Sequence, residues 1–409
     1  MQIQQIATEI VATLQKAGHI AYFAGGWVRD FLLKAPSDDI DIATSASVEE
    51  ITSLFPKTIP VGVAFGIIVV VEKNHSFEVA TFRKEKEYVD GRRPTHIEKA
   101  SPEEDAQRRD FTINGLFFDP IKETLFDFVE GKEDLEKGVV RAIGDPHQRF
   151  LEDRLRMMRA VRYSTRFRFP IDCDTKQAIL SHAKSLFPSV AIERVWQEFQ
   201  KMSRFSHFDQ SLLSLYELEL LPIIFPSLKN TPFTEIEKRV ALMNNLPAGS
   251  PLIAELLFLF PNTSLEEQLS LCDYLKLSRS DKELVQFLHS SQSLLSMPLS
   301  WQESLDHVEW AYFYANPSSP LSLKISQIQK TKEESFAFLK LHEEKQTLLV
   351  KQIDRIRHKT PLIKAADLQK EGILPGVQMG KFLKEAERIS VNELLEEKED
   401  VLKKIREKI

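Results

Sequence analysis

The hydrophobic pattern of this chain changes character at about residue 145. Before that point, short apolar runs alternate with helical patterns, and the stretch 67–82 is typical of two strands joined by a turn. After it, one amphipathic helical segment follows another as far as residue 408, with prolines at the joints between them. With 409 residues, the chain is too long for one compact core. The pattern predicts an α+β fold: a mixed sheet with helices first, then an all-helical remainder.

Local signals predict where several elements begin. Ser47, with Glu50 three residues later, has the spacing of a capping box at the start of a helix. Asp145-Pro146 combines an N-cap acid with proline in the first turn and predicts another helix start. The stretch 83–100 is charged and contains glycine and proline, so we expect a mobile loop there.

Composition narrows the class of protein. Hydrophobic residues make up 43% of the chain and charged residues 28%, as in ordinary soluble proteins. The two cysteines, Cys173 and Cys272, provide neither a disulfide framework nor a metal-ligand cluster. The sequence shows no signal-peptide pattern and no apolar run long enough to cross a bilayer. We therefore expect a cytoplasmic protein with no membrane partner.

Charge is unevenly distributed along the chain. The net charge is −6, which does not by itself indicate a nucleic-acid-binding protein. Seven arginines nevertheless fall between His147 and Phe169, against two acidic residues. Such a basic stretch can bind a polyanion, although solvated helix surfaces are the alternative interpretation.

A glycine pair follows the first predicted strand, at residues 19–24. Gly25 and Gly26 allow close approach of a phosphate, and the helix expected from Val28 would point its unpaired N–H groups toward it. Arg29, followed by Asp30, adds a cation within reach of a triphosphate. An ordinary strand–helix turn is the alternative for a glycine pair alone.

Two carboxylates lie two residues apart in Asp39-Ile40-Asp41. In an extended segment they would point to the same face and repel each other unless a cation lay between them. Their oxygens suit Mg²⁺, which substrate phosphates usually complete. The pair therefore indicates phosphoryl or nucleotidyl transfer, although an isolated Asp-x-Asp is more often a solvated turn or cap.

These motifs belong to a longer ordered set. The set resembles the class II tRNA nucleotidyltransferases, the CCA-adding enzymes, which share a polymerase-beta-like palm with bacterial poly(A) polymerases. It covers about the first 205 residues in colinear order, in the segments 25–33, 37–46, 77–83, 108–114, 127–141, 152–156 and 192–194. The resemblance implies a polymerase-beta-like head followed by a helical neck, body and tail.

The resemblance also implies roles for individual residues near the triphosphate and the ribose. Asp39 and Asp41 would be catalytic and hold the metal ions, with Glu78 as a possible third carboxylate or a charge at the edge of the core. A further group matches the motif that the family uses near the ribose, where an aspartate can accept from a 2′-hydroxyl: Arg109, Asp110 and Asn114. The alternative for Asp110 is a helix cap bonded to backbone.

Asp153 and Arg156 are spaced so that, on a helix, they share one face, with Arg159 a turn further on. A carboxylate accepts from an exocyclic amine and a guanidinium donates to a ring nitrogen or carbonyl. Together they could read the edge of cytosine or adenine without a nucleic-acid template. An intrahelical salt bridge is the alternative interpretation.

The resemblance implies template-independent addition of C, C and then A, from CTP and ATP, to the 3′ end of tRNA, with Mg²⁺ and release of pyrophosphate. A loop carrying Asp90-Gly91-Arg92 resembles the family's flexible loop, associated with the switch from C to A addition. A-only addition, poly(A) synthesis and an inactive RNA-binding scaffold remain alternatives.

We expect four domains: a nucleotidyltransferase head at 1–142, a neck with the base reader at 143–205, a body at 206–300 and a tRNA-binding tail at 301–409. The helical part should recognise the acceptor stem and elbow of tRNA through backbone and shape. The sequence leaves the oligomeric state open.

Overall fold

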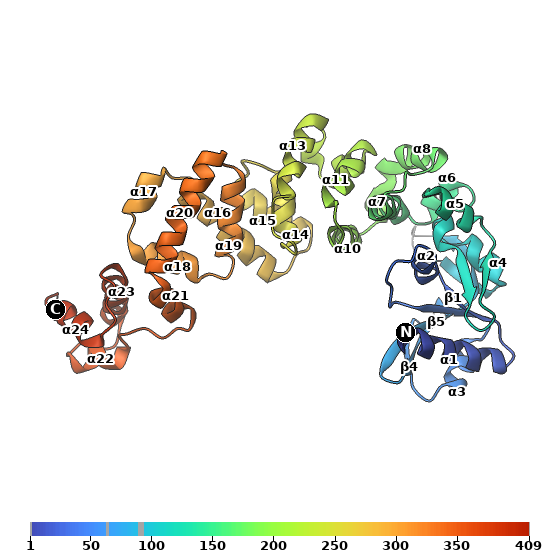
Figure 1. The fold of residues 1–409 in the computed structure, drawn as a ribbon, viewed down its shortest axis with the longest axis horizontal. Coiled ribbons are helices and arrows are strands. Elements are labelled where there is room, and N and C mark those ends of the chain that lie inside the picture. The colour runs from blue at the N-terminus through green and yellow to red at the C-terminus, as the bar shows by residue number, and fades with distance from the viewer. Residues whose placement is uncertain (1, 63–64, 89–93, 409) are drawn as a thin grey trace. The chain divides into compact units, whose positions relative to one another are not determined.

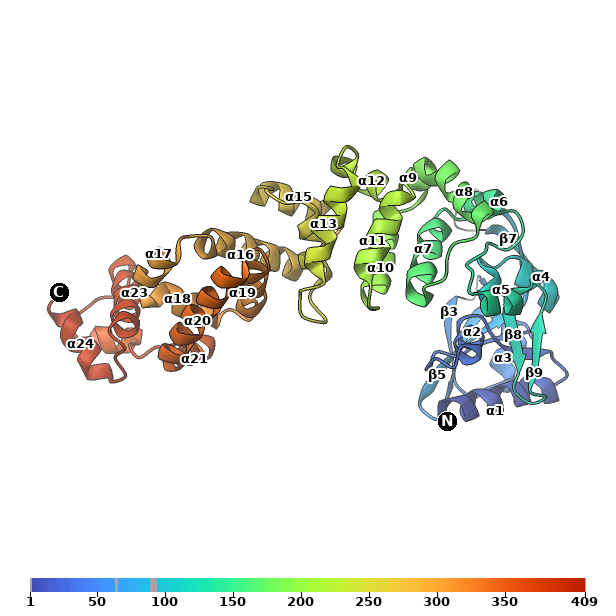
Figure 2. The same ribbon diagram turned by 45° about the horizontal axis from the view of Figure 1, so that its top comes forward.

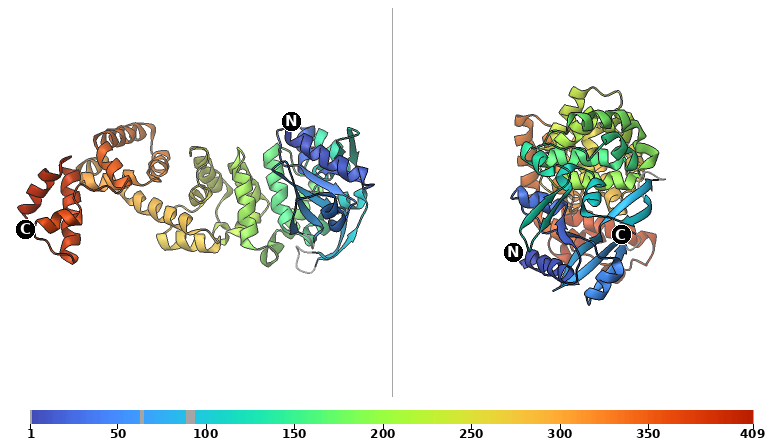
Figure 3. Two further views of the ribbon diagram at one scale, coloured as in Figure 1. Left: turned by 90° about the horizontal axis from the view of Figure 1, so that it is seen from below. Right: turned by 90° about the vertical axis from the view of Figure 1, so that its right-hand side faces the viewer.

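A computed structural model describes residues 2–62, 65–88 and 94–408 (Figure 1). The chain divides into two compact units, residues 1–240 and residues 241–409. The first unit contains a seven-stranded sheet and helices, and the described part of the second contains helices without strands (Figure 3). The predicted α+β class, with a mixed sheet followed by helices, is confirmed.

The sheet is mixed, in the order β3-β4-β5-β2-β1-β8-β9. Strands β2 and β5 run parallel, and the other neighbouring pairs are antiparallel. The predicted hairpin at 67–82 is confirmed as β4 and β5. The strands are β1 (Ala21–Ala24), β2 (Asp41–Thr44), β3 (Thr58–Gly62), β4 (Ile67–Glu72), β5 (His75–Thr81), β8 (Leu116–Asp119) and β9 (Thr124–Asp127).

One face of the sheet is covered by helices, among them α1 (Gln2–Lys16) and α3 (Val48–Leu54) (Figure 2), and carries a hydrophobic core cluster. Helix α1 buries Ile10 and Leu14 in the same cluster as Phe23 and Ile42 of the sheet. Helices α2 (Gly26–Leu32) and α3 contribute to this cluster too. The predicted capping box at the start of α3 is confirmed.

The other face carries small side chains on its central strands. Because side chains alternate along a strand, Ala43 lies on the face opposite Ile42. Ala24 of β1 and Ala43 of β2 belong to a second, smaller core cluster with Phe82 and Phe117. Small side chains leave space above this part of the sheet, and the candidate site lies there.

The expectation of a loop at 83–100 was wrong for most of that stretch. Strands β6 (Arg83–Tyr88) and β7 (Pro94–Lys99) form a separate two-stranded sheet. Their register places Lys84 opposite Glu98, a favourable cross-strand pair of charges. Charge and proline indicated a loop, but the backbone pairing of these two strands accommodates both. The segment Asp90-Gly91-Arg92 lies outside the described residues.

Helices complete the first unit. Helix α6 begins at Pro146 with Asp145 as its N-cap, as predicted. The remaining elements are α4 (Pro102–Gln107), η2 (Thr112–Asn114), α5 (Gly131–Lys137), α6 (Pro146–Glu152), α7 (Leu155–Phe167), α8 (Cys173–His182), η3 (Ala183–Ser185), α9 (Leu186–Ser189), α10 (Ile192–Ser203), α11 (Phe208–Glu217), α12 (Leu220–Ile224), η4 (Pro226–Leu228) and α13 (Phe233–Met243), which reaches the unit boundary.

The second unit packs its helices around two apolar clusters. One includes Trp310, Tyr314 and Phe338, and the other includes Ile389 and Ile405. No helix in the described ranges is long and apolar enough to cross a membrane. The four-domain division stays a prediction. The helices of this unit are α14 (Leu252–Leu256), η5 (Leu257–Leu259), α15 (Leu265–Tyr274), α16 (Arg279–Leu295), α17 (Leu299–Ser304), α18 (His307–Ala315), α19 (Ser319–Ile328), α20 (Lys332–Leu348), α21 (Val350–Arg357), α22 (Ala365–Lys370), α23 (Val377–Asn392) and α24 (Lys398–Arg406).

Candidate active site

A cleft of about 520 Å³ opens above the small-residue face of the sheet, within the first unit. It contains ten of the thirteen residues that the sequence motifs singled out. The lining residues are Ala24, Gly25, Gly26, Asp41, Ile42, Ala43, Ile67, Glu78, Ala80, Arg83, Arg108, Arg109, Asp110, Asn114, Asp153, Arg156, Arg159 and Tyr163. The cleft thus combines carboxylates, guanidinium groups and a glycine turn.

The glycine turn lies between β1 and α2. Gly25 has φ 66° and ψ −123°, a conformation that favours glycine. A Cβ atom on Gly25 would lie 2.9 Å from Nη1 of Arg109. The absence of a side chain therefore lets the turn and Arg109 lie in contact at the edge of the cleft.

Two strands place carboxylates side by side at the sheet edge of the cleft. The parallel register pairs Ile42 with Val79, so the residues before them, Asp41 and Glu78, are neighbours on the opposite face. Asp41 is partly buried and Glu78 is exposed. Asp39 is exposed, precedes the strand and does not line the cleft.

The carboxylates repel one another. Burial, followed by the charges of Asp39 and Glu78, raises the pKa of Asp41 to about 7, although Arg109 opposes the shift. A cation would relieve this repulsion, so the donor set fits a divalent metal. Within the described ranges, no group of three or more His, Cys, Asp or Glu side chains is arranged to hold a metal ion. Asp39 and Asp41 would therefore need further ligands, such as substrate phosphates.

A buried carboxylate, Asp105, holds the two arginines at the start of the ribose-type motif. Asp105 on α4 is 1% exposed and accepts from Nη2 of Arg108 at 2.7 Å and Nη2 of Arg109 at 3.0 Å. Arg109 also donates to the backbone oxygen of Asn114 at 3.2 Å. These bonds fix the Arg109 guanidinium at the cleft wall.

Asp110 is fully partnered by protein groups. Its Oδ1 accepts from the backbone N–H of Phe111 at 2.8 Å and from Nδ2 of Asn114 at 3.0 Å, and its Oδ2 accepts from Nε of Arg159 at 2.8 Å. Burial alone would raise the pKa of Asp110, but Arg159 and Asn114 hold it at about 2. The backbone bond expected of a cap is present, together with a strong ion pair.

Arg29 and Asp30 lie outside the cleft lining. Their side chains are 3% and 5% exposed and pair with each other at 2.7 Å. Arg166 of α7 also pairs with Asp30 at 3.0 Å, and Arg29 lies over the ring of Phe167 at 4.6 Å. Arg29 donates to Oδ1 of Asn114 as well. The structure places both residues in a buried network behind the site.

Asp153 is not on a helix, contrary to the prediction. It follows α6 with φ −143° and ψ 106°, and its Oδ1 accepts from the backbone N–H of Leu155 at 3.0 Å. This local bond favours a break in the helix before α7. Arg194 of α10 holds Oδ2 of Asp153 at 2.9 Å. Tertiary contacts, which the spacing does not reveal, thus position this carboxylate.

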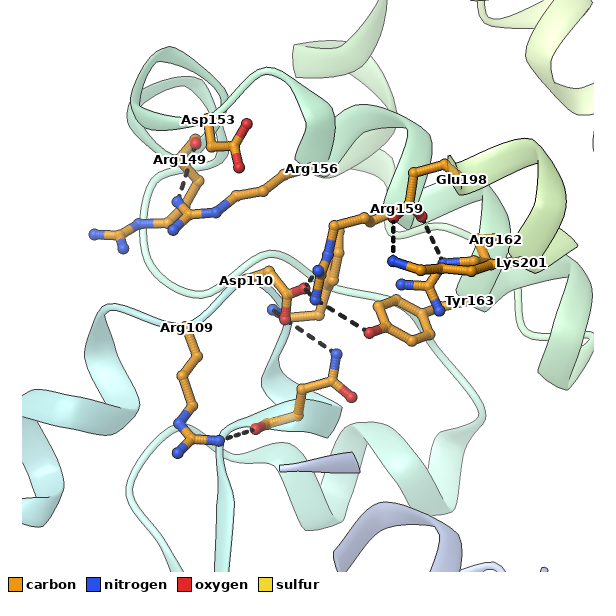
Figure 4. A network of polar contacts seen from close by, with 12 residues as sticks. Arg109, Asp110, Arg149, Asp153, Arg156, Arg159, Arg162, Tyr163, Glu198 and Lys201 are labelled. Atoms are coloured by element: carbon orange, nitrogen blue, oxygen red, sulfur yellow. Dashed lines mark hydrogen bonds and ion pairs between the residues drawn. The ribbon is translucent and has the colours of Figure 1, made fainter. Parts of the chain in front are cut away.

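Arg156 lies on α7 and reaches the cleft beside Asp153 and Arg159 (Figure 4). It pairs with Glu152 and donates to the backbone oxygen of Arg108 at 3.1 Å. Asp153, Arg156 and Arg159 therefore meet at one wall of the cleft, as the base-reader interpretation requires.

Known proteins match this chain along most of its length. A family model described as poly A polymerase head domain matches residues 21–141, and a second, described as probable RNA and SrmB-binding site of polymerase A, matches residues 168–231. A CCA-adding enzyme from Leuconostoc mesenteroides is 33% identical over 413 residues, covering 95% of this chain and 93% of the relative.

The chain belongs to the CCA-adding enzyme and poly(A) polymerase family.

Other members of this family match parts of the chain or its fold. A CCA-adding enzyme from Anoxybacillus flavithermus is 43% identical over 215 residues, and this match spans 52% of the chain and 54% of the relative. The chain thus spans only about half the length of that relative and of several Bacillus relatives. The crystal structure of the Bacillus stearothermophilus CCA-adding enzyme in complex with CTP has a TM-score of 0.77 and 27% identity, covering 100% of this chain and 99% of that one.

Three cleft residues with polar side chains, Arg83, Arg108 and Tyr163, had no assigned role from the family motifs. Arg83 and Arg108 lie at the end and the start of two matched segments, and this position beside the motif residues is the sequence signal that marks them. Tyr163 on α7 is 6% exposed and could not be distinguished from a core aromatic by its helical spacing.

Proposed function

We propose that this chain adds C, C and A, taken from CTP and ATP, to the 3′ end of tRNA without a nucleic-acid template. The observation that carries the proposal is the single cleft in which Asp41, the Gly25 turn and the Asp153/Arg156 wall converge. Near-full-length similarity to a CCA-adding enzyme supports it.

Asp39 and Asp41 would hold the divalent cation, which we propose to be Mg²⁺, with substrate phosphates completing its ligands. When bound, the cation supplies Lewis acidity that lowers the pKa of a hydroxyl and neutralises developing phosphate charge. Glu78, beside Asp41 in the sheet, would add negative charge that strengthens cation binding.

Backbone and arginine donors of the chain would bind the triphosphate. The Gly25-Gly26 turn leads into the N-terminus of α2, where N–H groups are available to phosphate oxygens. Arg109, held by Asp105, adds a fixed guanidinium next to the turn. The 3′-hydroxyl oxygen of tRNA attacks the α-phosphorus, the bond to the β-phosphate oxygen breaks, and pyrophosphate leaves.

The Asp153/Arg156 wall would select the base. The carboxylate of Asp153 accepts from the exocyclic amine that cytosine and adenine share, and Arg156 donates to the ring acceptor beside it. Uracil and guanine present the opposite donor pattern at these positions. Because Arg194 and Glu152 fix the two groups, the protein itself would act as the template.

Asp110 would act mainly by fixing Arg159 and Asn114, since all its bonds go to protein groups. Arg29 and Asp30 would support the same wall from behind, through Asn114 and Arg166. The helical remainder would bind tRNA by its phosphates, in the cytoplasm, where both free cysteines are stable.

A substrate panel tests the proposal. The purified chain is incubated with Mg²⁺, labelled CTP or ATP, and tRNA that ends at the discriminator base, at C or at CC. Incorporation of C into the first two and of A into the third is expected. Addition of A alone would indicate an A-adding enzyme, and a long A tail on unrelated RNA would indicate a poly(A) polymerase. Absence of incorporation would indicate a binding scaffold.

A further inference from the structure

A chain of polar contacts runs from the cleft into the protein (Figure 4). It begins at Arg159, which lines the cleft, continues through Tyr163 and Arg162 on the same helix, and ends at Glu198 and Lys201 on α10. Glu198 and Lys201 do not line the cleft. The network therefore connects cleft groups to a second helix, α10, whose residues do not line the cleft.

Tyr163 is the first link behind Arg159. Its hydroxyl accepts from Nη2 of Arg159 at 3.2 Å, and its side chain is only 6% exposed. The guanidinium carbon of Arg162 lies 4.3 Å from the centroid of the Tyr163 ring, that of Arg29 5.3 Å and that of Arg159 5.8 Å, so three cations lie against the ring and Arg162 is the nearest. The position of Arg162 therefore affects where the Tyr163 hydroxyl can accept from Arg159.

Glu198 fixes Arg162. Its side chain is 1% exposed, and its Oε2 accepts from Nε of Arg162 at 2.7 Å while its Oε1 accepts from Nζ of Lys201 at 3.0 Å. Burial alone would raise the pKa of Glu198, but Arg162 and Arg159 lower it, so the group is a carboxylate. A buried charge with one guanidinium partner holds that partner in one place.

We propose that Glu198 is a positioning residue for the nucleotide pocket. It holds Arg162 against Tyr163, so that the Tyr163 hydroxyl keeps the Arg159 guanidinium next to Asp110 and toward a bound nucleoside triphosphate. This inference rests on the proposed function only in requiring that the cleft binds CTP and ATP.

Three variants and a matched control test this role. Tyr163→Phe keeps the ring and removes the acceptor for Arg159. Glu198→Gln keeps the shape and removes the charge that holds Arg162. The double variant combines both, and Glu217→Gln makes the same change at an exposed position of α11. For each, calorimetry measures CTP and ATP affinity, kinetics measure KM and kcat, and thermal unfolding measures stability.

Each single variant should weaken CTP and ATP affinity roughly three- to tenfold, the effect of one lost or misplaced hydrogen bond, and raise KM more than it lowers kcat. The double variant should be no weaker than the worse single variant, because both act on Arg159. The control should match the wild type. Unchanged affinity in either single variant, or strictly additive losses, would overturn the proposal.

A loss of stability without a change in CTP or ATP affinity would also overturn the proposal, because it would show that Glu198 and Arg162 only stabilise the fold. If Glu198→Gln fails to fold, Tyr163→Phe alone still decides the link to Arg159. Calorimetry needs no turnover, so a wild type that binds CTP but incorporates nothing would contradict the proposed function and leave this comparison valid.

Discussion

Nε of Arg159 lies 2.8 Å from Oδ2 of Asp110, and this ion pair joins helix α7 to the loop before η2 at the wall of the cleft. It keeps Asp110 charged although the group is buried. The pair therefore contributes to both the shape of the site and the stability of the first unit.

Acid should weaken the first unit through Asp110. Its folded pKa is about 2, below the ordinary 3.8, so its stabilisation is present above about pH 4 and is lost as the pH falls through about 2. The shift corresponds to about 2 kcal/mol. Asp110→Asn should be less stable at pH 7 and lose less on acidification. Urea unfolding at pH 7 and pH 3 measures the difference, and equal pH dependence in both proteins would contradict this assignment.

The metal-site assignment predicts loss of chemistry without loss of RNA binding. Asp39→Ala or Asp41→Ala should abolish nucleotide incorporation, since each removes a cation ligand, and leave tRNA affinity within about twofold. Filter binding and incorporation assays measure the two effects. Asp38→Ala, at the exposed neighbouring position, is the control and should keep wild-type activity. Wild-type rates in either active-site variant would remove the assignment.

Base selection should depend on the carboxylate of Asp153. Asp153→Ala should reduce the preference for CTP and ATP over UTP by roughly tenfold or more, because a hydrogen-bond pair to the base is lost. Arg194→Met should give a smaller effect in the same direction, since Arg194 holds Asp153 at 2.9 Å. Competition assays with all four nucleotides measure both. An unchanged preference in Asp153→Ala would return the residue to a structural role.

The second unit should lose stability in mild acid because of His342. This side chain is 1% exposed, bonded to the Tyr314 hydroxyl at 2.7 Å and to Oε1 of Gln302 at 3.1 Å. Burial, with Lys345 and Lys330, lowers the pKa of His342 to about 4. The unfolded chain takes up a proton below about pH 6.5 while the folded unit does not, so stability falls as the pH drops from about 6.5 to 4.

The loss is about 3 kcal/mol when complete. Thermal unfolding at pH 7 and pH 5 measures it, and His342→Gln should show a smaller difference between the two conditions even if it is less stable at pH 7. A wild-type transition that does not change between these pH values would rule out the buried neutral histidine.

Helix starts that depend only on neighbouring residues could be predicted from the sequence. The capping box at Ser47 and the helix start at Asp145-Pro146 each need only neighbouring residues, and both are confirmed. The two strands at 67–82 were likewise evident from alternation and a turn.

Features that depend on tertiary contacts could not be predicted in the same way. The helix break at Asp153 is secured by Arg194, 41 residues away. Arg29 is buried because its guanidinium lies over the ring of Phe167 and its partner Asp30 also pairs with Arg166. Residue spacing in the sequence does not reveal these contacts. The two-stranded ribbon at 83–99 forms by pairing, although its composition indicates a loop.

The mass of a tRNA product tests whether this chain adds C, C and A. A tRNA that ends at the discriminator base is incubated with the purified chain, Mg²⁺, CTP and ATP, and the RNA is measured by mass spectrometry. We expect an increment of two cytidylates and one adenylate, with no longer product. An unchanged tRNA, or a tail of adenylates without cytidylates, would contradict it.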